Sequence, residues 1–356
     1  MPTQPEDFEW ATEDLSEVKD INEDGVPVVL LNKNIPNAEL QNSGIKYKET
    51  WPRQYLNYMF NLTFRWIKYL NNRVEQVSGK NLLINGSFDI WQRGTSLGGI
   101  TGGVNKYVAD RWAVFENYGS SSLLCTKGID NGKPFLSLVH EVVPAAQGRI
   151  TLAQTLENDS ALRLEGKTLT ATFDYELIGA SMTAITINAE YSTVGGAVVP
   201  SNPVIASSNN TTGTGRRTTS LTFTVPSAAT LTSTGTFGVR IYAIGTSEQI
   251  GDGIRVYNVK LEEGEYTTNF EQRSVGEELA LCQRYYERYL TQYSQDPSSI
   301  AMIPFKVEKR AVPAITKTFL GGSNDAVFSY VQKEGFRSLK TAGGVEDYSW
   351  TADAEI

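Results

Sequence analysis

The sequence predicts a mainly β protein, in which an antiparallel jelly-roll or β-sandwich domain follows an N-terminal coiled-coil helix. A short C-terminal helix and a small β-rich tail domain come after it. Two observations predict the sheets: apolar and polar residues alternate over many short segments, and Gly, Ser, Thr, Asn and Pro fill the links. The spacing of the segments shows no helical crossovers, which argues against a parallel nucleotide-binding sheet. A third observation, heptad spacing of apolar residues ahead of the β region, predicts the helix.

The 356 residues are enough for two or three domains. Changes in periodicity divide them into consecutive parts. These are an extended attachment segment at 1–50, an oligomeric coiled-coil helix at 51–79, a jelly-roll domain at 80–273, a helix at 274–293 and a small β-domain at 294–356.

The charge pattern limits the classes of partner. The net charge is −8 and no concentrated basic face is visible, so we expect no nucleic acid partner. Residues 1–20 are acidic, the reverse of a signal peptide, and no apolar run reaches the length of a transmembrane helix, so we expect no membrane insertion. Cys125 and Cys282 lie in different contexts, which favours reduced core thiols and folding in a cytoplasm.

Residues 51–79 carry the pattern of a coiled-coil seam. Pro52 suits the first turn of a helix, and Gly79 stands where a helix stop is expected. Between them apolar positions recur at alternating spacings of four and three, and we assign oligomerisation to these: Leu56, Phe60, Thr63, Ile67, Leu70, Val74 and Val77. Other faces of this helix are apolar too, so it packs either on its own chain or against further copies, and we favour self-association.

The clearest predicted strand covers 168–177, where Leu169, Phe173 and Tyr175 alternate with polar residues. Similar patterns predict strands near 108–116, 121–129, 134–143, 149–156, 185–191, 221–225, 237–243 and 254–262. The segment 193–219 is expected to be a link. An opening strand with a tight turn at Asn85-Gly86 is expected within 81–94.

The C-terminal helix begins with Ser274 and Glu277, which have the form of a capping box. An apolar stripe at helical spacing predicts that this helix continues to residue 293 and packs on a core; it comprises Leu279, Cys282, Tyr286, Tyr289 and Tyr293. Short strand-like runs at 299–307, 313–319 and 326–332 predict the small β-domain, followed by a polar end.

The sequence carries none of the common catalytic or phosphate-binding motifs, and no His/Cys cluster for zinc. The single histidine, His140, falls in an alternating run that predicts a strand residue with satisfied hydrogen bonds. Asp174 and Glu176 are the candidate pair for a glycoside hydrolase, but their period places them on the solvent side of a strand. We therefore expect no enzymatic activity and no cofactor.

Aromatic residues are the better lead for ligand binding, because sugar rings stack on exposed aromatic faces. Trp91, Trp112 and Tyr242 are expected to be core residues. The candidate ligand-binding residues lie in the polar C-terminal stretch and are Tyr330, Phe336, Tyr348 and Trp350. Asp89, just after the opening turn, is a candidate ligand for a structural calcium, together with backbone oxygens or Asn258.

Several motifs occur in a specific order along the chain. They are NLLINGSFDIWQRG at 81–94, ADRW at 109–112, LEEGEYTTNFEQR at 261–273, EEL at 277–279 and CQRYY at 282–286. The ordered set resembles bacteriophage tail fibre and receptor-binding proteins, in which a jelly-roll domain similar to carbohydrate-binding modules is closed by a CQRYY helix. The resemblance covers roughly residues 80–310, and residues 51–77 are similar to helices near the virion-attached end of such fibres.

This resemblance implies a homotrimeric virion appendage that is folded in the host cytoplasm. Its N-terminal segment would contact other virion proteins, and its outer domains would attach to a host surface glycan, where several weak sites give avidity. Two alternatives stay open. One is a structural adaptor or short fibre on collar, head or baseplate that holds another virion protein, and the other is a glycan-degrading enzyme.

Overall fold

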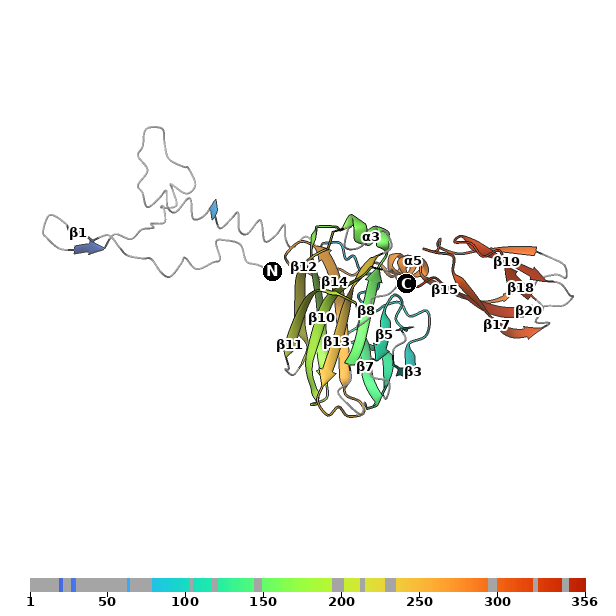
Figure 1. Cartoon of the computed structure of the whole chain (residues 1–356), viewed down its shortest axis with the longest axis horizontal. Coiled ribbons are helices and arrows are strands. Elements are labelled where there is room, and N and C mark those ends of the chain that lie inside the picture. Colours follow the sequence, from blue (N-terminus) through green and yellow to red (C-terminus); the bar gives the residue numbers. More distant parts are fainter. Residues whose placement is uncertain are drawn as a thin grey trace, which may run out of the picture. The chain divides into compact units, whose positions relative to one another are not determined.

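The computed structural model describes residues 19–21, 27–29, 63–64, 79–102, 105–116, 121–143, 149–193, 202–211, 215–227, 235–293, 300–322, 326–340 and 346–356 (Figure 1). The chain divides into two compact units, Met1–Ser78 and Gly79–Ile356. In the first unit, strands β1 (Lys19–Ile21) and β2 (Pro27–Val29) pair antiparallel. Thr63 of the predicted seam is helical and exposed, while the other seam residues lie outside the described residues. The coiled coil and its copy number therefore stay predictions.

Two six-stranded antiparallel sheets form a β-sandwich in the second unit, as the sequence predicted. Their strand orders are β11-β10-β13-β8-β5-β4 and β12-β9-β14-β7-β6-β3. The elements are β3 (Ser96–Thr101), β4 (Lys106–Tyr107), β5 (Ala113–Glu116), β6 (Ser122–Asp130), β7 (Lys133–Val142), β8 (Arg149–Leu156), α3 (Asn158–Arg163), β9 (Thr168–Ile178), β10 (Met182–Ser192), β11 (Val204–Thr211), β12 (Arg217–Thr224), β13 (Thr236–Gly245) and β14 (Gly253–Glu263).

The core of the sandwich follows from the alternation of apolar residues. In β9, Phe173 and Tyr175 are buried between the sheets, whereas Asp174 keeps partial exposure on the other face. The register between neighbouring strands aligns their apolar residues into rows across the sheet. Ile187 of β10 stands opposite Ile241 of β13, for example, and both belong to the core. Burying an aliphatic or aromatic side chain of this kind contributes about 1.5–3 kcal/mol. This row of apolar contacts fixes which face of each strand is turned outward.

The sequence prediction missed β3, α3 and β11. The error is clearest for β11, which lies inside the predicted link at 193–219. As an edge strand, β11 presents few apolar residues: Ala206 packs against the core, and Asn210 donates to Thr219 at 2.6 Å. Its Ser and Asn residues hide the alternation that identified the central strands.

Residues 81–94 form turns, so the predicted opening strand is wrong. Asn85 adopts a φ of +57°, a left-handed conformation that asparagine tolerates. Its buried side-chain amide donates to the backbone carbonyls of Ile90 and Asp110 at 2.9 and 3.0 Å. Its backbone N–H donates to Glu278. These side-chain contacts replace the ladder of a strand and satisfy the buried backbone.

Helix α5 (Val275–Gln283) starts with the predicted capping contact, in which the Ser274 hydroxyl accepts from the Glu277 N–H at 3.3 Å. It ends at Gln283, so the predicted helix is wrong beyond that residue. Tyr286–Tyr293 form strand β15 instead. Tyrosine and threonine favour strands, and β20 supplies an antiparallel partner over the whole of β15, which overrides the helical spacing of the tyrosines.

The chain ends in two three-stranded antiparallel sheets, ordered β15-β20-β17 and β16-β19-β18. The strands are β15, β16 (Ile300–Pro304), β17 (Ala314–Gly322), β18 (Ala326–Ser329), β19 (Gly335–Lys340) and β20 (Glu346–Asp353). Residues from both sheets, including Phe336 and Trp350, share a second core. The end of the chain, for which the sequence predicts only the polar end of the small β-domain, supplies β20, the central strand of one sheet.

A polar cluster connects the large sandwich to the C-terminal sheets. We call it the junction, and it comprises Arg93, Asp110, Arg111, Tyr285, Tyr286 and Glu355. The Arg111 guanidinium lies 3.5 Å from the centre of the Tyr285 ring and forms an ion pair with the Glu355 carboxylate. It also donates to the backbone carbonyl of Thr155 at 2.7 Å. Arg111 is 2% exposed, so its charge depends on these partners.

Arg93 forms the second half of the junction. Its guanidinium lies 3.6 Å from the centre of the Tyr286 ring and forms ion pairs with Asp110 and Glu355 at 3.5 and 3.3 Å. Burial raises the pKa of the Asp110 carboxyl to about 6, and the Glu355 carboxylate adds to the rise, while the Arg93 guanidinium opposes it. Arginine stacked on aromatic rings and paired with carboxylates thus joins residues far apart in the sequence.

We expect Arg111→Met to destabilise the protein by about 3–5 kcal/mol, because it breaks a buried ion pair and leaves the Glu355 carboxylate with the longer, 3.3 Å contact to Arg93. Urea unfolding measures this change. Lys167→Met is the matched control, since Lys167 pairs with Glu263 where both side chains are about half exposed, and its loss costs about 0–1 kcal/mol. Equal effects of the two substitutions would contradict a junction that depends on the Arg111 charge.

The raised pKa of Asp110 predicts a specific pH dependence. The folded state holds this proton more tightly than the unfolded chain, so this carboxyl makes stability fall as pH rises from about 4 to about 6. The move from 3.8 to about 6 corresponds to on the order of 3 kcal/mol. The measurement is the free energy of unfolding of the wild type minus that of Asp110→Asn. This difference should fall by on the order of 3 kcal/mol as pH rises from about 4 to about 6. A difference that is independent of pH would show that the carboxyl titrates normally.

Candidate functional site

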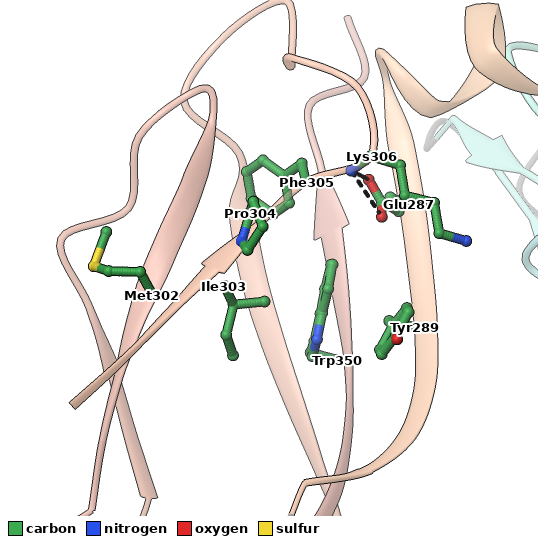
Figure 2. Close-up of a pocket in the computed structure, with 8 residues that line it drawn as sticks. All are labelled: Glu287, Tyr289, Met302, Ile303, Pro304, Phe305, Lys306 and Trp350. Carbon is green, nitrogen blue, oxygen red and sulfur yellow. Dashed lines mark hydrogen bonds between the residues drawn. The ribbon is translucent and has the colours of Figure 1, made fainter. Parts of the chain in front are cut away.

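A pocket in the C-terminal sheets, within the described part of the chain, forms a candidate functional site. It lies between β15 and β16, with β20 behind it, and encloses about 350 Å³ (Figure 2). Ligand pockets commonly have volumes of about 300–1,000 Å³. The lining residues are Glu287, Tyr289, Met302, Ile303, Pro304, Phe305, Lys306 and Trp350.

Two aromatic rings form one wall of the pocket. Tyr289 and Trp350 are stacked, with ring centres 5.6 Å apart and planes 20° apart, and Figure 2 shows the rings side by side. Trp350 is held from behind by Phe305 and Phe336, whose ring centres lie 5.7 and 5.2 Å from its own. Tyr289 is 37% exposed and Trp350 is 3% exposed. The buried ring therefore fixes the orientation of the exposed one.

The opposite wall is apolar. β16 presents Met302, which is 68% exposed, beside Pro304, which is also exposed. Ile303 is buried and belongs to the second core. Figure 2 shows the Met302 side chain pointing away from the Tyr289 and Trp350 rings, so this methionine adds an adaptable apolar edge to the pocket.

Polar groups lie at one end of the pocket. The Glu287 carboxylate is buried and pairs with the equally buried Lys309 ammonium at 2.7 Å. Lys309 also donates to the backbone carbonyl of Gln283 at 2.6 Å. Burial lowers the pKa of Lys309, while Glu287 opposes this shift. The Glu287 oxygens accept in addition from the backbone N–H of Lys306 at 3.2 and 3.4 Å, as the dashed lines in Figure 2 show.

The structure separates the predicted ligand-binding residues. Phe336 and Tyr348 are fully buried in the second core, so their assignment as exposed binding residues is wrong. Trp350 is also a core residue, although one part of it lines the pocket. Tyr330 is 66% exposed with the Arg337 guanidinium 3.9 Å from its ring centre, and it does not line the pocket.

Sequence reasoning missed the residues that accompany Trp350. Tyr289 was assigned to the core-facing stripe of a helix, and Glu287 was not singled out. The signal that could have found them is a spacing of two residues, which is typical of a strand. In β15 this spacing puts Glu287 and Tyr289 on one side, and in β20 it does the same for Tyr348, Trp350 and Ala352.

The calcium hypothesis gains no support at Asp89. Its carboxylate accepts from the Gln272 amide at 2.7 Å, and its backbone oxygen accepts from the Lys127 ammonium at 2.8 Å. Asn258 donates to a different carboxylate, that of Asp174. Within the ranges that the structure describes, no group of three or more His, Cys, Asp or Glu residues is placed to hold a metal ion. No helix in these ranges is long and apolar enough to cross a membrane.

The candidate glycosidase carboxylates lie on the outer face of β9 in ion pairs. Asp174 pairs with Arg216 at 2.7 Å, and Glu176 pairs with Arg255 at 2.9 Å. These are cross-strand pairs of an ordinary kind for a partly solvated sheet face. His140 is a buried strand residue of β7, but neither of its ring nitrogens has a hydrogen-bond partner in the described structure, contrary to prediction. Burial lowers its pKa, which favours a neutral ring.

A further polar cluster lies on the outer face of β10 and β13. The Arg240 Nε donates to both carboxylate oxygens of Glu190 at 2.9 Å, and Asn188 donates to the same carboxylate at 2.8 Å. The Arg240 guanidinium lies 4.7 Å from the centre of the Tyr242 ring. Tyr242 therefore lies on this outer face, and the prediction that it is a core residue is wrong. Glu190 and Arg240 are buried, so this cluster is less accessible to a ligand than the rim of the C-terminal pocket.

No protein-family model and no curated protein sequence matches the chain. The similar solved structures include a putative sugar-binding protein from Bacteroides thetaiotaomicron, with 11% identity and a TM-score of 0.33, covering 52% of this chain and 100% of that one. They also include TmCBM61 in complex with β-1,4-galactotriose, with 14% identity and a TM-score of 0.30, covering 52% and 99%. The CBM22-2 xylan-binding domain of Paenibacillus barcinonensis Xyn10C has 17% identity and a TM-score of 0.29, covering 43% and 92%. Likenesses of this strength assign no function to this chain.

Proposed function

We propose that the protein binds a saccharide in the C-terminal pocket and acts in adhesion. The observation that carries this proposal is the half-exposed Tyr289 ring, held in place by Trp350 at the wall of a preformed pocket. A sugar ring presents an apolar face of C–H groups, and it stacks on an aromatic side chain much as other flat apolar groups do. A rigid platform lowers the entropy lost on binding.

The other lining residues fit the same ligand class. Glu287 supplies carboxylate oxygens that accept hydrogen bonds from hydroxyl groups, and its pairing with Lys309 fixes the position of its side chain. Met302 and Pro304 add apolar surface to the lining. A small number of polar groups in a mainly apolar pocket is the usual composition of a specific binding site.

The sequence resemblance supplies the biological setting of this proposal. We place the protein on a virion as a tail fibre, with residues 1–50 contacting other virion proteins and the helix at 51–79 bringing copies together as a homotrimer. Several copies of one weak pocket give avidity for a host surface glycan. The alternative is a structural adaptor on collar, head or baseplate. Imaging of particles distinguishes the two, because a fibre is free at its outer end and an adaptor is covered at both ends.

Tyr289→Ala should weaken glycan binding about tenfold or more, because it removes the exposed aromatic platform while the buried core stays filled. A glycan array followed by titration calorimetry of the intact oligomer measures the change. Tyr266→Ala is the matched control, since Tyr266 is 61% exposed in the large sandwich. Unchanged binding by Tyr289→Ala would place the saccharide elsewhere.

We infer that the protein binds glycan without cleaving it, because Asp174 and Glu176 are both committed to arginine partners. Incubation with host polysaccharide should release no reducing sugar above the blank. Release by the wild type that disappears in Asp174→Asn or Glu176→Gln would overturn this inference and establish the glycan-degrading alternative.

A further inference from the structure

We propose that the C-terminal pocket selects a saccharide that carries an acidic group, with Lys306 as the residue that recognises it. This inference rests on the proposed function and adds the chemical class of the ligand. It is argued from the balance of charges around the pocket and from the position of the Lys306 ammonium.

The charges that line the pocket leave an excess of one cation. Glu287 and Lys306 are the ionisable residues of the lining apart from the tyrosine. The Glu287 charge is already balanced, because the buried Lys309 ammonium lies 2.7 Å from its carboxylate. Lys306 is exposed, and no ion pair of its side chain is found within the described residues. An anionic group on the ligand would supply the missing partner.

The Lys306 ammonium also stands in a suitable place. It lies 5.6 Å from the centre of the Tyr289 ring, the platform on which the sugar is proposed to stack. Figure 2 shows its side chain extending away from the Glu287 carboxylate, so the ammonium is not folded back onto that group. A carboxylate or sulfate on a stacked sugar would come within reach of the flexible lysine side chain. Hydrogen bonds between charged groups are roughly twice as strong as neutral ones.

The same strand offers a control for the charge. Arg288 follows Glu287 in β15, is exposed, and points to the opposite side of the strand from Glu287 and Tyr289. Arg288→Gln removes one positive charge from the same strand without touching the pocket. Lys306→Gln removes one from its rim.

The test uses an array of acidic oligosaccharides, uronates, sialosides and sulfated glycans, each printed beside its carboxyl-reduced or desulfated counterpart. The intact wild-type protein should bind one acidic member about tenfold more tightly than its neutral counterpart, as expected for a charge-assisted contact. Lys306→Gln should bind the two members equally, at the affinity of the neutral one. Arg288→Gln should keep the preference.

The outcomes separate this inference from the proposed function. Equal binding of an acidic glycan and its neutral counterpart by the wild type, lost in Tyr289→Ala, would leave the pocket as a sugar site and overturn the acidic class. A preference that survives Lys306→Gln but is lost in Arg288→Gln would overturn the role of Lys306. Binding to no member of the array would overturn the proposed function together with this inference.

Discussion

The contact between Arg111, Tyr285 and Glu355 joins the sandwich to the C-terminal sheets. A buried arginine needs a partner for its charge and a partner for its planar face. Here the Glu355 carboxylate pairs with the charge, and the Tyr285 ring stacks on the face of the guanidinium. Arg111 also takes a φ of +72°, which is uncommon for a residue with a side chain. The backbone therefore adopts a costly conformation to place this guanidinium, which indicates that its contacts outweigh that cost.

Three of the five motifs that prompted the resemblance to fibre proteins meet at this junction. Residues 81–94 contribute Arg93, the ADRW motif contributes Asp110 and Arg111, and the CQRYY motif contributes the two stacked tyrosines. These motifs lie far apart in the sequence and share one physical task, which is to fix the C-terminal sheets on the sandwich. The pocket residues Glu287 and Tyr289 come directly after CQRYY in β15. The motifs thus define a support for the candidate site and not the site itself.

The sequence predicted the central strands of the sandwich well, because each buries one apolar row between the sheets, as Phe173 and Ile241 illustrate. It failed where tertiary pairing decides the outcome. Tyr286, Tyr289 and Tyr293 have helical spacing, and pairing with β20 overrides it and selects the strand. Of the candidate site, Trp350 was identified, but as an exposed residue, while Phe336 and Tyr348 proved to be core. Their neighbours in the sequence are polar, and distant apolar residues bury them, which local patterns do not reveal.

The antiparallel pairing of β15 with β20 has a mechanical consequence. Tyr286, where β15 begins, stands opposite Asp353, where β20 ends, so both strands reach the junction at the same end of the ladder. A pull on a ligand held by Tyr289 and Trp350 would be shared by two paths, a covalent one through β15 into α5 and one through β20 into the ion pairs of Glu355. The site is therefore built on the two paired strands whose ends reach the junction.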